Sequence, residues 1–153
     1  MKILFVCYGN ICRSPMAEAL CRHALAARQD LRDVVVASGG VGAVDGNCAT
    51  DLARDVLRRL YQLDLTGHTA QRVRKGTRAD VVFAMDHETL EALGGLRLKA
   101  RVELLGDYAG TGEDVDDPFG ATRSEYEACA HIIDRLVRKA IDRLAKEAAS
   151  DDA

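Results

Sequence analysis

Short apolar runs recur along the chain with polar and turn-forming residues between them. They occupy residues 3–6, 34–36, 81–85 and 102–105. Continuous apolar runs of this length are typical of strands that are buried on both faces of a parallel sheet. The pattern therefore predicts four such strands.

Between and after the predicted strands, apolar residues recur with the spacing of a helix. It covers residues 16–27, 52–60, 86–93 and, most clearly, 129–144, while the tail 148–153 is expected to fray. Alternation of strand and helix implies right-handed crossovers. We therefore predict an α/β fold with an open four-stranded parallel sheet, helices on both faces, and a ligand site at the carboxyl ends of the strands.

Length and composition narrow the class further. The 153 residues are 48% hydrophobic and contain no linker or repeat, so residues 1–153 are expected to form a single domain. The net charge is −3, with both signs mixed along the chain and no basic stripe, so nucleic acid is not an expected partner. No apolar stretch approaches the ~20 residues of a membrane span, and the run at residues 1–7 is too short for an export signal. Five cysteines, an odd number, favour a reducing cytoplasm.

The loop after the first predicted strand has the residues of an anion site. It reads Cys7-Tyr8-Gly9-Asn10-Ile11-Cys12-Arg13-Ser14-Pro15. We expect Ser14 to cap the following helix and Pro15 to be its first residue. Gly9 and Asn10 tolerate left-handed backbone, so successive N–H groups can point inward at an anion, with the helix dipole behind them. Arg13 can give a phosphoryl group two parallel hydrogen bonds.

A cysteine at the base of such a loop has a specific chemical consequence. The N–H groups that hold a phosphate also stabilise a thiolate, which is the nucleophilic form of Cys7. The spacing Cys-x₅-Arg-Ser predicts a phosphoryl-transfer centre. Cys7 attacks phosphorus, Arg13 and the backbone amides hold the oxygens, and no metal is needed.

Other interpretations of this loop were open from the residues alone. A cysteine that ends a buried strand is often an inert core residue. Cys7 and Cys12 are spaced more widely than the usual zinc pair, and no second Cys/His pair at ligand spacing exists. The loop also lacks the Gly-Lys-Ser/Thr ending of a nucleotide-binding loop. The combination of Cys, Gly-Asn, Arg and Ser-Pro after a strand favours catalysis.

The same residues resemble a known family. The segment Val6-Cys7-Tyr8-Gly9-Asn10-Ile11-Cys12-Arg13-Ser14-Pro15-Met16-Ala17-Glu18 resembles the signature loop of the low-molecular-weight protein-tyrosine phosphatases almost throughout. Ser38-Gly39-Gly40 resembles the family's Ser-Ala-Gly with Gly39 in place of alanine, Gly67-His68 resembles its Gly-His, and Asp117-Pro118-Phe119-Gly120 resembles its general-acid loop. The resemblance covers nearly the whole chain. It implies hydrolysis of phosphotyrosine in proteins through a phosphocysteine, without a cofactor.

Asp117 is the predicted general acid and base. The departing phenolate needs a proton, and a carboxylic acid on a loop can supply it and then activate water. Asp117 precedes Pro118, which favours an extended backbone. The residues alone leave Asp116 and a merely solvated acidic turn open. The resemblance selects Asp117, because the family's acid directly precedes proline.

The resemblance also implies supporting roles. The phosphate-binding loop would comprise Tyr8, Gly9, Asn10, Ile11, Cys12 and Ser14, and a hydrogen-bond network of Asn10, Ser14, Ser38 and His68 would hold that loop open. Tyr8, Ile11 and Phe119 would form the walls around the substrate. The resemblance supports a protective Cys7–Cys12 disulfide, which the spacing does not establish. Expected partners are a tyrosine-phosphorylated protein and inorganic phosphate or another oxyanion as product or inhibitor.

Three rival functions remain at this point. The first is a protein-arginine phosphatase of the same fold, because the residues after Phe119 are similar to the bacterial branch that includes such enzymes. The resemblance implies a threonine in that branch at the position where this chain has Ile11. A thioredoxin-coupled arsenate reductase is another, but it needs a further cysteine pair, and none lies between Cys48 and Cys129. A non-catalytic phosphate-binding module is disfavoured by the presence of Cys7, Arg13 and Asp117.

Overall fold

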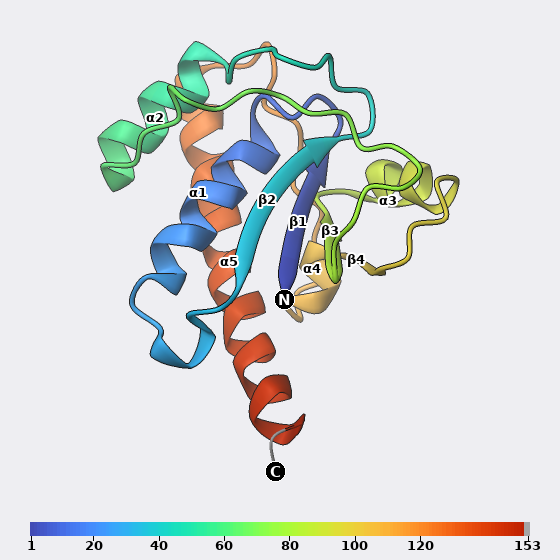
Figure 1. Cartoon of the computed structure of the whole chain (residues 1–153). Coiled ribbons are helices and arrows are strands. Elements are labelled where there is room, and N and C mark those ends of the chain that lie inside the picture. The colour runs from blue at the N-terminus through green and yellow to red at the C-terminus, as the bar shows by residue number, and fades with distance from the viewer. Residues whose placement is uncertain (152–153) are drawn as a thin grey trace.

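A four-stranded parallel sheet forms the centre of the fold (Figure 1). The computed structural model describes residues 1–151. The strands are β1 (Lys2–Cys7), β2 (Val35–Gly40), β3 (Val81–Ala84) and β4 (Arg101–Leu104). They lie in the order β2-β1-β3-β4, and every neighbouring pair is parallel. The predicted strand number and sheet type are confirmed, with boundaries shifted by at most a few residues.

Five α-helices and one short 3₁₀ turn connect the strands. They are α1 (Arg13–Leu25), η1 (Gln29–Leu31), α2 (Asp51–Tyr61), α3 (His87–Gly94), α4 (Leu105–Tyr108) and α5 (Arg123–Asp151). The predicted strand at 102–105 was one residue too long, because Leu105 begins α4. The predicted fraying of the tail is wrong for residues 148–151, which continue α5, and residues 152–153 lie outside the described part. Ala, Glu and Lys sustain a helix there without an apolar face.

Helices cover both faces of the sheet, as predicted. Figure 1 shows α1 and α5 on one side of the sheet and α3 on the other. Ile3 and Phe5 belong to the core cluster that contains residues of α1 and α5, while Leu4 and Val6 belong to the cluster that contains Leu93 of α3 and Val73. This period of two along β1 is what allows one apolar strand to be buried on both sides. No helix within residues 1–151 is long and apolar enough to cross a membrane.

The carboxyl end of β1 is the point at which the chain enters the predicted site. Cys7 ends β1 and pairs in register with Gly40 at the end of β2. A Cβ on Gly40 would lie 2.5 Å from the carbonyl oxygen of Tyr8 and 2.9 Å from the backbone nitrogen of Asn10. Glycine is therefore required here, because any side chain would push the loop after β1 away from β2.

Candidate active site

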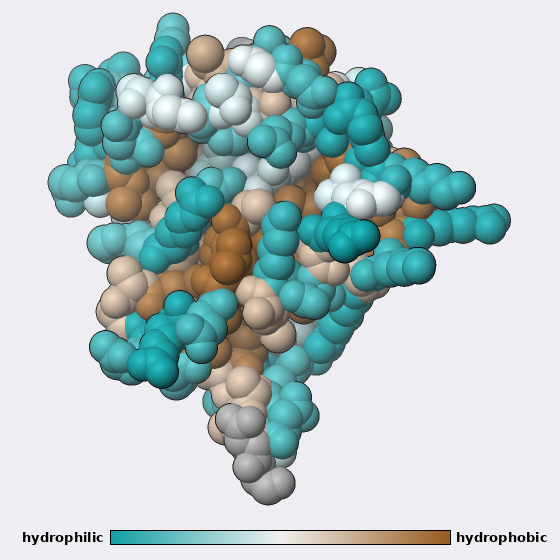
Figure 2. All heavy atoms as spheres, viewed as in Figure 1, coloured by the Kyte–Doolittle hydropathy of each residue, from teal (hydrophilic) through white to brown (hydrophobic). Residues whose placement is uncertain are grey.

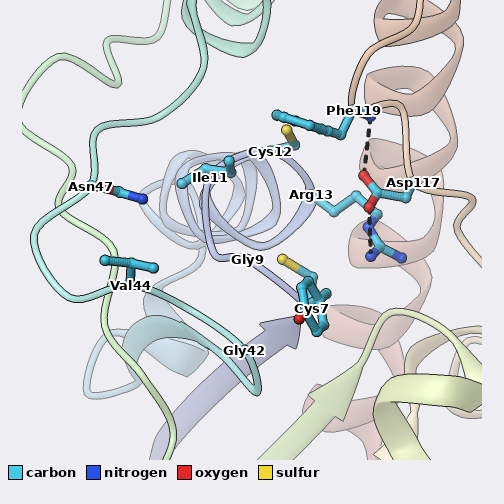
Figure 3. Close-up of a pocket in the computed structure, with 11 residues that line it drawn as sticks. Cys7, Gly9, Ile11, Cys12, Arg13, Gly42, Val44, Asn47, Asp117 and Phe119 are labelled. Carbon is cyan, nitrogen blue, oxygen red and sulfur yellow. Dashed lines mark hydrogen bonds and ion pairs between the residues drawn. The ribbon is translucent and has the colours of Figure 1, made fainter.

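A cavity of about 240 Å³ lies over the loop that joins β1 to α1 (Figure 3). Its lining consists of Cys7, Tyr8, Gly9, Ile11, Cys12, Arg13, Gly42, Val44, Asn47, Asp117 and Phe119. Three separate regions of the chain meet here: the loop after β1, the segment after β2, and the loop before α5. Parallel strands bring such segments to one edge of a sheet, as the sequence interpretation expected.

Cys7 lies at the base of this cavity, almost entirely buried. Its Sγ accepts a hydrogen bond from the backbone N–H of Asn10 at 3.3 Å and lies 3.0 Å from the Oγ of Ser14. Both groups can donate to a sulfur anion, and the start of α1 directs its N–H groups to the same place. The Cys7 sulfur thus lies at the base of the cavity with two hydrogen-bond donors in reach.

Ser14 does not cap α1, which corrects the predicted start of that helix. The helix begins at Arg13, its N-cap is Cys12, and no side chain caps it, so Ser14 and Pro15 are its second and third residues. The Ser14 hydroxyl instead contacts residues distant in sequence, including the carbonyl oxygen of Gly39 at 3.2 Å. The local capping rule failed because the hydroxyl is used in a tertiary network.

Asn10 is the centre of that network. It is fully buried and adopts a left-handed backbone with φ of 56°, which the sequence interpretation allowed for Gly9 and Asn10 and which Asn10 alone of the two uses. Its Nδ2 donates to the Oγ of Ser14 at 2.8 Å and to the Oγ of Ser38 at 3.0 Å. Its Oδ1 accepts from the backbone N–H of Gln71 at 2.9 Å. One buried side chain thus joins three segments of the chain around the loop.

His68 holds the same loop from outside. Its Nε2 lies 2.7 Å from the carbonyl oxygen of Asn10. Because a carbonyl oxygen can only accept, this contact requires the proton to be on Nε2. The structure therefore brings Asn10, Ser14, Ser38 and His68 together, which is the grouping that the resemblance implied.

A glycine in β2 explains a departure from the family pattern. A Cβ on Gly39 would lie 2.7 Å from the Cγ2 of Val73, which packs on the same face of the sheet as Leu4 and Val6. The alanine expected at this position would need Val73 to move. The glycine and the valine are thus matched in this chain.

The guanidinium of Arg13 has partners at Nη1 and an open hydrogen-bonding position at Nε. Its Nη1 donates to the Oδ2 of Asp86 at 2.5 Å and to the carbonyl oxygen of Val115 at 2.9 Å. Its Nε is buried without a partner in the described part of the chain. A buried donor without an acceptor is rare, and a phosphoryl oxygen in the cavity would supply the acceptor.

Asp86 acts as an anionic anchor for this arginine. Burial on its own would raise the pKa of Asp86, but hydrogen bonds from Thr89 and Arg13 bring that pKa below its usual value. Burial opposes the charge of Arg13 as well, and the bond to Asp86 nevertheless raises the pKa of the guanidinium. The pair therefore stays ionised across the neutral range.

Asp117 lies at the mouth of the cavity and faces Arg13. Its Oδ2 is 3.6 Å from Nη2 of Arg13, and its Oδ1 accepts from the backbone N–H of Phe119 at 3.1 Å (Figure 3). Its side chain is 48% exposed, so a leaving group that enters from solvent can reach it. This is a suitable position for a proton donor.

Two aromatic side chains flank the entrance. Tyr8 is 62% exposed and Phe119 is 65% exposed, which is unusual for large rings and leaves their faces open to a ligand. Tyr8 packs so closely on Gly42 that a Cβ there would lie 2.5 Å from its ring. Ile11 lines the cavity below them.

Cys12 has contacts that differ from those of Cys7. Its Sγ lies 3.3 Å from the hydroxyl of Tyr126 and 3.5 Å from that of Thr50. Burial raises the pKa of the Cys12 thiol, which keeps it protonated. All five cysteines are free thiols in this structure.

Several residues of the site were missed from the sequence. They are Gly42, Val44, Asn47, Thr50, Asp86, Val115 and Tyr126. Asp86 could have been found, since it directly follows a predicted strand and begins a predicted helix, and both facts place it at the ligand edge. The others lie on loops or on α5 and give no local signal. In residues 1–151, no group of three or more His, Cys, Asp or Glu side chains is arranged to hold a metal ion.

Fold and site together define a cysteine-dependent phosphatase. Residues 2–150 match the family described as low molecular weight phosphotyrosine protein phosphatase. The chain belongs to this family, and its members are cysteine-dependent hydrolases.

Relatives in the family are named for two substrate classes. A Bacillus subtilis protein named protein-arginine-phosphatase is 34% identical over 152 residues, which is 96% of this chain and 99% of the relative. The crystal structure of a low molecular weight protein tyrosine phosphatase from T. tengcongensis has a TM-score of 0.83 and 33% identity, covering 93% of this chain and 98% of that one. Vibrio vulnificus Wzb, solved with benzylphosphonate, has a TM-score of 0.78 and 26% identity over 95% of this chain and 97% of that one.

Proposed function

We propose that this enzyme hydrolyses phosphotyrosine in proteins, with Cys7 as nucleophile, Arg13 as the phosphate ligand and Asp117 as general acid and base. The observation that carries the proposal is the buried Nε of Arg13, which has no partner in the part of the chain that the structure describes, in a cavity whose base is the Cys7 sulfur. A donor without an acceptor beside a nucleophile is arranged for an oxyanion. Benzylphosphonate in the Vibrio vulnificus relative is a ligand of that chemistry joined to an aromatic ring.

The first chemical step transfers the phosphoryl group to the enzyme. The Cys7 sulfur forms a bond to phosphorus while the bond from phosphorus to the phenolic oxygen breaks. Asp117 donates its proton to that oxygen, and Arg13 with the loop N–H groups holds the phosphoryl oxygens. The products are phosphocysteine, neutral tyrosine and an ionised Asp117.

Hydrolysis in the second step restores the enzyme. The Asp117 carboxylate takes a proton from water, the water oxygen bonds to phosphorus, and the bond from phosphorus to sulfur breaks. Ser14 has one proton and two acceptors in reach, the carbonyl oxygen of Gly39 and the Cys7 sulfur. Turning that proton to the sulfur stabilises the departing thiolate.

Phosphotyrosine is the proposed substrate because of the apolar and aromatic lining. Ile11 lines the same cavity as Cys7 and the exposed rings of Tyr8 and Phe119. A phenyl ring can pack between these side chains while its phosphate reaches the base, whereas the shorter phosphoserine would leave phosphorus away from the sulfur. Phosphoarginine is the second candidate, favoured by the 34% identity to the Bacillus subtilis protein.

Comparing kcat/KM on phosphotyrosine and phosphoarginine substrates separates these two functions. We expect wild type to prefer phosphotyrosine and Ile11→Thr to shift the ratio toward phosphoarginine. Val35→Thr makes a similar change on the exposed start of β2 and is the matched control, in which the ratio should hold. A wild type that prefers phosphoarginine defeats the proposal, as does a ratio that Ile11→Thr leaves unmoved.

Cys12 is proposed as the redox partner of Cys7. Peroxide converts a thiolate to a sulfenic acid, and attack by the Cys12 thiol would expel water and form a disulfide that thiol reductants reverse. Recovery after peroxide should fall sharply in Cys12→Ser and stay normal in Cys48→Ser, whose cysteine is exposed. Unchanged recovery in Cys12→Ser would remove this role.

The setting of the reaction follows from the same features. We propose a single catalytic domain over residues 1–153, working in a cytoplasmic, reducing compartment because its five cysteines, an odd number, do not suit a disulfide scaffold. Its partners are a phosphorylated protein and the phosphate that it releases.

A further inference from the structure

A second large cleft lies at the opposite end of the sheet from Cys7. It has a volume of about 730 Å³, and its charged lining is Lys2, Lys75, Arg78, Arg97, Lys99 and Asp80. These residues come from the start of β1, the segment before β3 and the segment before β4. The charges looked evenly mixed along the sequence, and only the fold gathers these five cations. We call this the basic cleft.

The cations of the basic cleft have no ion-pair partner. All five side chains are exposed, and none lies within 4.0 Å of a carboxylate oxygen in residues 1–151, although nearby Arg74 pairs with Asp45 at 2.7 Å. The single carboxylate of the cleft, Asp80, accepts the backbone N–H of Lys2 at 2.6 Å. The cleft is therefore strongly positive on a chain whose net charge is −3.

The basic cleft contains one residue with an unusual backbone conformation and some apolar surface. Arg97 adopts a left-handed conformation with φ of 51°, which is uncommon for a residue with a side chain. Leu98 and Ala79 add apolar surface between the cations. Hydrophilic side chains project, with apolar surface between them, from the side of the molecule where α3 and its flanking segments lie (Figure 2).

A continuous segment joins the basic cleft to the active site. Gln71 donates its backbone N–H to Asn10 in the phosphate loop, and the chain then runs through Lys75 and Arg78 to the start of β3. Along β1, the five steps from Lys2 to Cys7 span about 17 Å at ~3.3 Å per residue. One extended polypeptide could reach both places.

We propose that the basic cleft binds an acidic, extended segment of the phosphorylated protein substrate. The proposal rests on the proposed function, because it adds a second contact for the same substrate. Unpaired cations on a concave surface with apolar floor suit carboxylate side chains on a peptide. A nucleic acid is disfavoured as the ligand. The net charge of the whole chain is −3 although the basic cleft is positive, so the rest of the surface is negative and would repel a long polyanion.

Phosphotyrosine peptides with and without an acidic segment test this inference. One peptide of the pair carries six glutamates and the other carries six serines. A linker of about ten residues separates this segment from the phosphotyrosine, so that the linker can follow the protein surface. Each peptide is made twice, with the segment before the phosphotyrosine and with the segment after it. For wild type at low salt we expect KM to be about three- to tenfold lower with the acidic segment, since exposed ion pairs each contribute modestly. The kcat values should agree.

Charge reversal in the basic cleft should remove the preference. Lys75→Glu with Arg78→Glu should equalise the two KM values and leave turnover of p-nitrophenyl phosphate unchanged. Lys139→Glu with Lys146→Glu makes the same change in net charge at exposed residues of α5 and should keep the preference. Equal KM values in wild type, or equal effects of the two double variants, would overturn the inference.

Direct binding separates this inference from the proposed function. A fluorescein-labelled six-glutamate peptide without phosphate should bind wild type and not the Lys75/Arg78 double variant, as measured by anisotropy. Tighter binding of a labelled single-stranded oligonucleotide would assign the cleft to nucleic acid and contradict the proposal. Failure of phosphotyrosine hydrolysis with retained peptide binding would instead reject the proposed function.

Discussion

The Nη1 of Arg13 lies 2.5 Å from the Oδ2 of Asp86, and Asp86 is also the N-cap of α3. Its Oδ1 accepts the backbone N–H of Thr89 at 2.8 Å while its other oxygen holds the arginine. One carboxylate thus fixes the start of a helix and one end of the guanidinium. The Nε, which has no partner among residues 1–151, is then held in place for a phosphoryl group.

Asp86→Asn tests this anchoring. Asparagine is as good an N-cap as aspartate, so α3 should keep its start, while the charge that orients Arg13 is lost. We expect kcat/KM for p-nitrophenyl phosphate to fall by about ten- to a hundredfold, as loss of a buried charged bond of ~1.5–3 kcal/mol implies. Vanadate should bind more weakly by a similar factor. Asp114→Asn, which alters the carboxylate beside His87, is the control and should keep both values.

Asn10 should contribute through its side chain more than through its backbone angle. Asn10→Gly keeps the left-handed backbone and loses three hydrogen bonds, while Asn10→Ala loses those bonds and adds a backbone cost of ~1–2 kcal/mol. We expect both to lower the free energy of unfolding, by about 2–4 kcal/mol for glycine. Urea denaturation would measure this. Equal stabilities of wild type and Asn10→Gly would contradict the assignment of Asn10 as the centre of the network.

Asp117→Asn should discriminate between leaving groups. An amide cannot give a proton to the phenolate, so kcat with phosphotyrosine should fall by about 10²–10⁴. The loss should be smaller for aryl phosphates whose leaving group departs without protonation. Asp116→Asn is the matched control on the neighbouring residue. If the loss is the same for every leaving group, Asp117 is not the general acid.

Thiol reactivity should sort the cysteines by environment. Burial raises the pKa of Cys21 and of Cys129 to about 12 and also raises that of Cys12, so all three stay protonated below pH 8 in the folded protein. Iodoacetate at pH 7 should therefore modify Cys7 and the exposed Cys48, and inorganic phosphate should protect Cys7 alone. Peptide mapping gives the result. Labelling of Cys12 ahead of Cys7 would contradict the assigned nucleophile.

The sequence predicted the sheet because apolar runs are a direct consequence of burial on both faces. Its limits appear at Ser14, where the local rule for caps was correct in general but the hydroxyl bonds to Gly39 and Asn10 instead. Tyr126 reaches the site only through the packing of α5, which no local pattern encodes, whereas the position of Asp86 directly after a predicted strand was a usable signal. The basic cleft was missed for the same reason, since its five cations are spread from Lys2 to Lys99 along the chain.

The most direct test of the account is to trap the phosphoenzyme. Wild type is mixed with a phosphotyrosine peptide, quenched in acid during turnover and digested, and the peptides are examined by mass spectrometry. We predict a phosphoryl group on the peptide that contains Cys7, both in wild type and in Cys48→Ser. In Cys7→Ser we predict no turnover. A phosphoryl group on any other residue, or measurable turnover by Cys7→Ser, would contradict a phosphocysteine mechanism at Cys7.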